Sequence, residues 1–197
     1  MANKNKKDNK KLWITIGIVA VVLILIYSFF IGNYNSLVGL DEDVAASWGD
    51  VEVQYQRRAD LIPNLVDTVK GFAAQEKEVL LGVTEARTKW LNAQGGSVGS
   101  QVEAAQGMDS ALARLLVTVE AYPDLKSNQN FLALQDELAG TENRVAVART
   151  RYNEIVKAFN KKVRMFPSNI IAGMFGFEKA DLFESDNGAD KVVDVEF

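Results

Sequence analysis

Arginine, carboxylate and amide side chains gather in two separate runs and are the first candidates for chemistry. They are Arg57, Arg58, Asp60 and Asn64 in the first run, and Glu142, Asn143, Arg144, Arg149, Arg151 and Asn153 in the second. A guanidinium holds a carboxylate or phosphate through two parallel hydrogen bonds, so these residues can form a recognition patch. They can also form ion pairs that fix the register of neighbouring helices. The sequence favours this structural role because Arg58 falls in a row of apolar positions, and pairing of Arg57 or Arg58 with Glu142 would be one form of it.

Histidine and cysteine are both absent from the chain, which excludes several kinds of active site. There can be no disulfide, thiolate nucleophile, lipoprotein cysteine, iron–sulfur cluster, Ser-His-Asp triad or histidine-containing zinc or di-iron site. Carboxylates alone would have to carry out any proton transfer. We therefore predict a protein that is not an enzyme, without catalytic residues, cofactor or metal. A hydrolase that works through carboxylates is the weakest alternative.

Two short motifs resemble ligand sites only superficially. The consecutive acids Asp41, Glu42 and Asp43 would not face one centre on a helix, so we interpret them as the first turn of a helix, where acids complement the helix dipole. The stretch GGSVGS at 95–100 lacks the lysine and the spacing of a phosphate-binding loop, and its glycines predict a turn.

Charge is unevenly distributed along the 197 residues, although the net charge is only −4. Residues 1–11 hold five lysines and one aspartate, whereas residues 178–197 hold seven acids and two lysines. The overall acidic balance argues against a nucleic-acid partner. The chain thus has a basic head, a nearly balanced body and an acidic tail.

Residues 12–31 form an uncharged run of twenty residues that predicts a transmembrane helix. At ~1.5 Å per residue the run spans ~30 Å, the thickness of the hydrocarbon core, and Trp13 and Tyr27 lie near its ends where interfacial aromatics are common. A cleaved signal peptide needs a shorter apolar region and small residues at the cleavage site, which FFIGNYNS does not provide. A buried core helix is the third possibility. We expect an uncleaved anchor whose partner is the lipid bilayer.

The body that follows is helical by period. Apolar residues recur every three to four positions from Tyr34 to about Leu91, with a kink or break predicted near Pro63. A third helical segment covers 101–119, a proline turn covers 121–128, and Ser127 or Asn128 is expected to cap the last helix. That helix, 128–165, has a seven-residue row: Phe131, Leu138, Val145, Tyr152, Phe159 and Phe166. We predict an all-α fold in which a single transmembrane helix precedes an elongated antiparallel bundle of three to four long, coiled-coil-like helices.

The domain organisation follows from these segments. We expect a basic segment at 1–11, the transmembrane helix at 12–31 and the bundle at 33–166. Residues 167–183 begin with an apolar stretch and are expected to fold back as a cap on the bundle; exposure to a partner or membrane surface is the alternative. Residues 184–197 are acidic and are expected to be disordered.

Several long blocks resemble the LemA family of bacteria. They are YNSLVGLDEDV at 34–44, VQYQRRADLIPNLVDTVKG at 53–71, LLVTVEAYPDLKSNQNFLALQDEL at 115–138 and GTENRVAVARTRYNEIVKAFNKKVRMFP at 140–167. The resemblance covers roughly residues 12–184 and fades at GGSVGS and in the acidic tail. It implies a membrane-anchored antiparallel helical bundle and implies no catalytic activity.

These observations favour a membrane-anchored scaffold or adaptor for another membrane or envelope protein. The alternative is membrane organisation, either through self-assembly into a homo-oligomer or through the apolar segment 168–177. We expect the protein to be single-pass in the bacterial cytoplasmic (inner) membrane.

The five lysines before the span predict a cytoplasmic N-terminus and a bundle on the outer side, because basic residues are retained in the cytoplasm. Some descriptions of the LemA family imply the opposite orientation. A reporter that is active only outside the cytoplasm, fused after Phe197, should therefore give signal. Activity from a cytoplasmic reporter alone at the same position would reverse the orientation.

Overall fold

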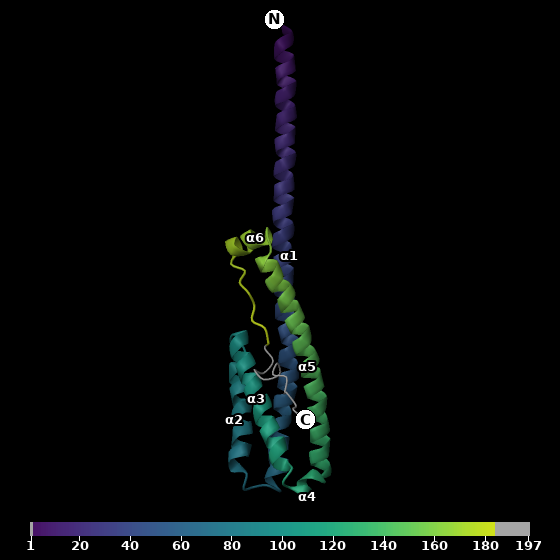
Figure 1. Cartoon of the computed structure of the whole chain (residues 1–197), viewed down its shortest axis with the longest axis vertical. Helices are drawn as coiled ribbons and strands as arrows, with labels where there is room; N and C mark the ends of the chain where they lie inside the picture. The colour runs from purple at the N-terminus through teal and green to yellow at the C-terminus, as the bar shows by residue number, and fades with distance from the viewer. Residues whose placement is uncertain (1, 184–197) are drawn as a thin grey trace, which may run out of the picture. The chain divides into compact units, whose positions relative to one another are not determined.

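The computed structural model describes residues 2–183, with side chains from Trp13 onward. Its helices are α1 (Ala2–Lys70), α2 (Lys77–Ala93), α3 (Val98–Val119), α4 (Pro123–Lys126), α5 (Gln129–Arg164) and α6 (Ser168–Phe175), as Figure 1 shows. No strand occurs in this part of the chain, which confirms the all-α prediction. The expected disordered tail at 184–197 lies outside the described residues.

Two compact units make up the described chain. The anchor unit combines residues up to Asp43 with residues 158–180. The bundle unit combines residues 44–157 with residues 181–183, the last of the described chain. Helices α1 and α5 contribute residues to both units.

The apolar run lies on α1 with its side chains exposed, as a lipid-facing helix requires. Trp13, Leu25 and Tyr27 are all more than 60% exposed. Among the described residues, this is the one helix that is long and apolar enough to cross a membrane. It fits a single-pass membrane protein.

Helix α1 does not end after the apolar run, which overturns one interpretation. Asp41, Glu42 and Asp43 lie inside a helix that runs from Ala2 to Lys70, so they are not a first helical turn. Their carboxylates therefore do not complement a helix N-terminus. The glycines and asparagines just after the run do not terminate the helix, because a single such residue costs a helix only about 1 kcal/mol.

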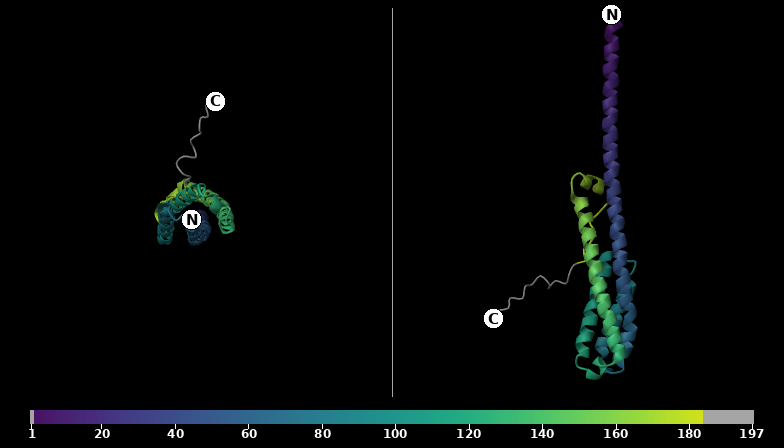
Figure 2. Two further views of the ribbon diagram at one scale, coloured as in Figure 1. Left: turned by 90° about the horizontal axis from the view of Figure 1, so that it is seen from below. Right: turned by 90° about the vertical axis from the view of Figure 1, so that its right-hand side faces the viewer.

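Contacts in the bundle unit establish how its long helices run. Asp50 pairs with Arg151 and Arg57 with Glu137, so the residue number falls on α5 as it rises on α1. Hydrogen bonds from Gln94 to Gln56 and from Arg87 to Ala59 make α2 antiparallel to α1 as well. Both views in Figure 2 show α2, α3 and α5 beside the C-terminal part of α1. The antiparallel bundle is thus confirmed.

The seven-residue rows mark the buried faces. On α5 all members of the row except Phe166 are at most 7% exposed. Phe166 is 78% exposed because α5 has already ended at Arg164. On α1 the row Leu37, Val44, Val51 and Leu65 is buried in the same way, with Arg58 inside it.

Three boundaries compare differently with the sequence signals. Asn128 caps α5, accepting hydrogen bonds from the backbone N–H groups of Asn130 and Phe131 at 3.0 and 3.1 Å. The glycine loop is shorter than expected, since Ser97 already caps α3 by accepting the N–H of Ser100. The predicted break near Pro63 is wrong: α1 continues to Lys70 and the chain turns after Gly71.

An arginine on α2 explains how α1 tolerates its proline. Pro63 has no N–H, so the carbonyl of Ala59, four residues earlier, loses its normal helical donor. Ala59 is fully buried, and water cannot replace that donor. Arg87 does so instead: its Nε donates to the Ala59 oxygen at 2.9 Å. The helix therefore passes Pro63 without an unsatisfied buried carbonyl.

Arg87→Met should lower the free energy of unfolding by about 1–3 kcal/mol, the cost of a buried carbonyl left without a donor. In a Pro63→Ala background, residue 63 regains its N–H and the same substitution should cost much less. Denaturant unfolding of the four variants in the cycle measures the difference. Equal costs of Arg87→Met in both backgrounds would contradict the role assigned to Arg87.

Candidate functional site

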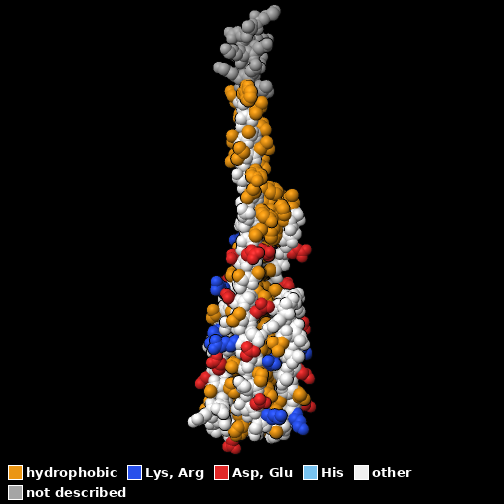
Figure 3. Space-filling model, turned by 180° about the vertical axis from the view of Figure 1, so that it is seen from behind, with side chains coloured by type: hydrophobic (Ala, Val, Ile, Leu, Met, Phe, Trp, Pro, Cys, Tyr) orange, Lys and Arg blue, Asp and Glu red, His pale blue; other side chains and the backbone are white. Residues whose placement is uncertain are grey.

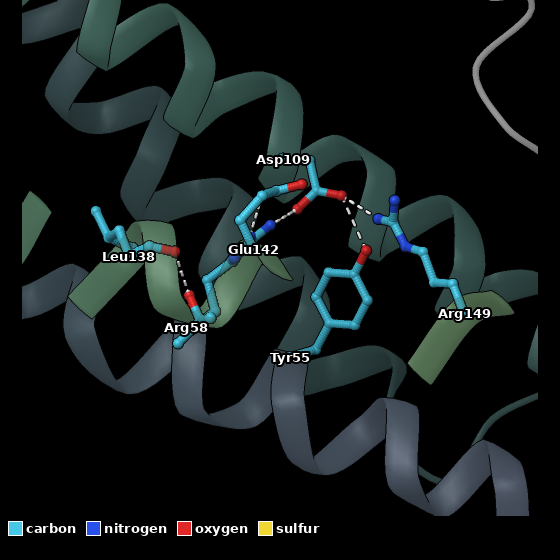
Figure 4. A network of polar contacts seen from close by, with 7 residues as sticks. Tyr55, Arg58, Asp109, Leu138, Glu142 and Arg149 are labelled. Carbon is cyan, nitrogen blue, oxygen red and sulfur yellow. Dashed lines mark hydrogen bonds and ion pairs between the residues drawn. The ribbon is translucent and has the colours of Figure 1, made fainter. Parts of the chain in front are cut away.

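Asp109 on α3 is the centre of a polar cluster in the bundle unit, which Figure 4 shows. One carboxylate oxygen accepts from Arg58 of α1, and the other accepts from Arg149 of α5 and from the hydroxyl of Tyr55, at 2.9 Å for the tyrosine. Arg58 also pairs with Glu142 of α5. These side chains, which we call the Asp109 cluster, connect three helices.

Arg58 is the most buried charged group of the cluster. Its side chain is only 3% exposed, whereas Asp109 and Glu142 are 24% and 60% exposed. A guanidinium in such a place must be paired and hydrogen-bonded, since an unpaired buried charge costs several kcal/mol. Carboxylates from two helices supply those partners. Arg58 and Glu142 therefore form the pair that the sequence suggested.

Aromatic rings surround the cluster. The Arg149 guanidinium lies 4.2 Å from the ring centroid of Phe183 and 5.2 Å from that of Tyr55, positions that favour cation–π attraction. Phe183 stacks on Tyr55 with an angle of 9° between the rings and also contacts Trp48. Phe183 is 3% exposed and is buried against side chains of α1 and α5.

Two side chains of α5 fasten the chain around Phe183. Asn153 donates from Nδ2 to the Phe183 carbonyl oxygen and accepts the Phe183 N–H at Oδ1, each at 2.8 Å. Tyr152 donates its hydroxyl to the carbonyl of Asp181 at 2.7 Å. Burial and, as the smaller cause, the nearby Asp181 carboxylate raise the pKa of Tyr152 to about 12, so the hydroxyl remains a donor at neutral pH. The side-chain amide of Asn153 thus bonds to the backbone of Phe183.

The other sequence candidates lie at the rim of the bundle unit or outside the cluster. Arg57 and Arg144 both approach Glu137, at 2.8 and 3.7 Å, and Arg151 approaches Asp50 at 3.3 Å. These pairs are exposed and each is worth less than about 1 kcal/mol. Three further candidates, Asp60, Asn64 and Asn143, are exposed and do not join the Asp109 cluster.

Sequence reasoning missed the residue on which the cluster is centred. Asp109 lies on the third helix, which has only one other acid, Glu103. Its position directly after the buried Met108 was the available signal, because an acid beside an apolar row requires a partner. Tyr55 was also missed as a member, since an aromatic residue in an apolar row looks like ordinary core, and Phe183 was missed as a neighbour because it lies in an irregular segment.

A cavity of about 250 Å³ opens beside the cluster, between α3 and α5. Apolar side chains that include Leu112, Leu116 and Leu138 line it, and Arg58, Asp109 and Glu142 form its polar part. Within the described residues there is no group of three or more acids placed to hold a metal ion. The arrangement can join helices electrostatically, and its charged groups are mutually neutralised.

Comparison with known proteins agrees with this architecture. The profile of the LemA family matches residues 47–197, most of the chain. The chain belongs to the LemA family. The match includes every member of the Asp109 cluster.

Curated relatives of this LemA-family chain have two kinds of name. Magnetosome protein MamQ 2 of Paramagnetospirillum magneticum is 29% identical over 80% of this chain and 67% of the relative. Magnetosome protein MamQ of Magnetospirillum gryphiswaldense is 26% identical over 89% and 73%. Protein LemA of Metamycoplasma hominis is 27% identical over 81% and 70%. None of these three names describes a reaction. The family match, these relatives and the apolar run of α1 together fit a membrane-associated protein.

Asp109→Ala should destabilise the protein by about 3 kcal/mol, because the substitution removes the more buried of the two carboxylates that face the Arg58 guanidinium. Arg151→Ala is the matched control, since it breaks an exposed pair in the same unit and should cost less than about 1 kcal/mol. Thermal unfolding of the two variants tests the comparison. A loss for Asp109→Ala no larger than for Arg151→Ala would show that the cluster is not structural.

Proposed function

We propose that the protein is a membrane-tethered, non-enzymatic helical bundle that acts as a scaffold or adaptor for another envelope protein. One observation carries this proposal. The polar residues best suited to chemistry, Arg58, Asp109, Glu142 and Arg149, bind one another across three helices of the bundle unit. Side chains that pair with one another in this way stabilise the packing of the helices.

Such a protein works by holding its bundle at the membrane surface, where a partner can bind it. The apolar part of α1 anchors the chain, and the same helix continues into the bundle unit without a break. A partner in the same membrane then meets the bundle at a high effective concentration, because both are confined to one surface.

The outer faces of the bundle unit offer contact sites for a partner. Val53 on α1, Val117 on α3 and Val147 on α5 are 62%, 73% and 69% exposed. These three positions, each on a different helix, sample the exposed faces of the bundle unit that are available to a partner. Two of the relatives are named magnetosome proteins, which supports a role in a membrane-associated structure.

Self-assembly of the bundle is the second candidate. The same exposed valines would then contact another copy of this chain. The two candidates differ only in the identity of the partner, which one experiment can reveal.

A photoreactive residue placed at Val117 or Val147 should form a discrete crosslink to one other protein in native membranes. Val145 is the matched control, because it lies on the same helix as Val147 and is fully buried. Mass spectrometry of the crosslinked species identifies the partner.

A crosslink to a second copy of this chain would support self-assembly instead. The scaffold proposal would be contradicted if no exposed position gave a discrete crosslink and the buried control gave none either. The exposed positions are Val53, Val117, Val147 and Leu81.

A further inference from the structure

The anchor unit exposes a second apolar surface besides the transmembrane run. Residues 165–177 contain no charged side chain. Ile171 and Ala172 on one side of α6 are 1% exposed, so one face of this short helix is packed. Five other large apolar side chains of this segment are largely exposed: Met165, Phe166, Ile170, Met174 and Phe175 are between 49% and 78% exposed. A packed helix that is also apolar on its outer face needs a further apolar environment.

Helix α6 is held next to the end of the transmembrane run. The ring of Tyr34 on α1 lies 4.7 Å from that of Phe175 and 6.1 Å from that of Phe177, between centroids. Tyr34 follows Ile31, the last residue of the run, by three residues, a rise of ~4.5 Å along the helix. The residues of α1 that α6 contacts thus lie within about one helical turn of the end of the apolar run. Figure 3 shows the apolar side chains of α6 beside those of α1.

Hydrogen bonds keep the segment in this place. The hydroxyl of Ser168 donates to the carbonyl of Lys162 at 2.5 Å at the start of α6. After α6, Asn160 donates to the carbonyl of Ala180 and accepts its N–H, at 2.8 and 2.9 Å. The outward-facing apolar side chains thus belong to a fixed element.

The surroundings favour lipid over protein as the occupant of this surface. The last turn of α5, which leads into the segment, carries Lys161, Lys162 and Arg164. Basic residues beside exposed Phe, Ile and Met are typical of elements that lie in the headgroup layer of a bilayer with anionic lipids. The first acidic residue after them in the sequence is Glu178, which follows the end of the apolar segment.

We infer that α6 and its flanking residues 165–177 lie in the interfacial layer of the bilayer that α1 spans, with Phe166, Ile170, Met174 and Phe175 inserted at the boundary between headgroups and acyl chains. This second contact fixes the tilt and rotation of the anchor unit at the membrane. It requires only that α1 spans the bilayer, and is independent of the scaffold role and of which leaflet faces the bundle.

The absence of cysteine allows the depth of single positions to be measured on the full chain. Met174→Cys, labelled with an environment-sensitive nitrobenzoxadiazole probe, is reconstituted in vesicles of phosphatidylcholine and phosphatidylglycerol. Val117→Cys in the bundle unit is the matched control, since the two parent residues are 66% and 73% exposed, and Leu25→Cys is the reference within the span.

The probe at 174 should be quenched several-fold less by aqueous iodide than the probe at 117, and it should be quenched by lipids with a nitroxide near the carbonyl end of the acyl chain. Iodide quenching equal to that at 117 would overturn the inference. Protection from iodide without quenching by the nitroxide lipids would also overturn it, because protein and not lipid would then cover α6.

A second variant separates insertion from local folding. With the probe at Phe166→Cys, replacing the exposed Ile170 and Met174 by Asn should increase iodide quenching several-fold. Replacing the exposed Val117 and Leu132 by Asn removes similar apolar side chains from the bundle unit and should leave the quenching unchanged. An identical response to both pairs would contradict anchoring by α6.

Discussion

A buried positive charge is the constraint on which the bundle unit depends. Arg58 occupies a core position of α1, between Val51 and Leu65 in the same apolar row, and its side chain is almost inaccessible to water. A buried guanidinium without a partner would cost several kcal/mol, so the fold has to bring carboxylates to it. Asp109 from α3 and Glu142 from α5 meet this demand. Any slip of these helices along α1 would separate the charges, so the ion pairs specify the register of three helices.

The rest of the bundle unit is consistent with this centre. Tyr55, one turn before Arg58, donates to the same Asp109 carboxylate, and Arg149 approaches it from α5 and lies over Phe183. Phe183 in turn is fastened by Asn153, so the chain after α6 returns to the aromatic surroundings of the cluster. Of the residues that the sequence offers as a recognition patch, Arg58, Glu142 and Arg149 therefore take part in contacts between helices. The proposed function therefore relies on the exposed faces of the bundle unit and on the proposed membrane contacts.

The sequence predicts most of the architecture because periodicity reports burial directly. The seven-residue rows of α1 and α5, the uncharged run before Tyr34 and the Asn128 cap are all visible without a structure. Pro63 misleads, because a donor on another helix replaces its missing N–H and no local pattern reveals Arg87 in that role. The acids at 41–43 mislead for a similar reason: nothing local shows that the transmembrane helix and the first bundle helix are one helix.

The candidate site could be predicted only in part. Arg58 stands out as a charge in an apolar row, and its pairing with Glu142 follows from helices that are expected to be neighbours. The role of Asp109 cannot be predicted, because it depends on α3 lying against α1 and α5, and a sequence does not state which helices contact one another. Phe183 escapes because it reaches the core through an irregular segment, where periodicity carries no information.

The central claim is that the Asp109 cluster holds the helices together and does not bind a partner. A double-mutant cycle with Arg58→Met and Asp109→Leu, combined with crosslinking from Val117 in native membranes, tests it most directly. The claim predicts that the double variant loses at least about 1 kcal/mol less free energy of unfolding than the two single variants lose together, because neither the Arg58 nor the Asp109 charge is then left without its partner. It also predicts that the double variant forms the same crosslink as the natural chain. Variants that all unfold like the natural chain, with the crosslink lost whenever Arg58 or Asp109 is replaced, would contradict it.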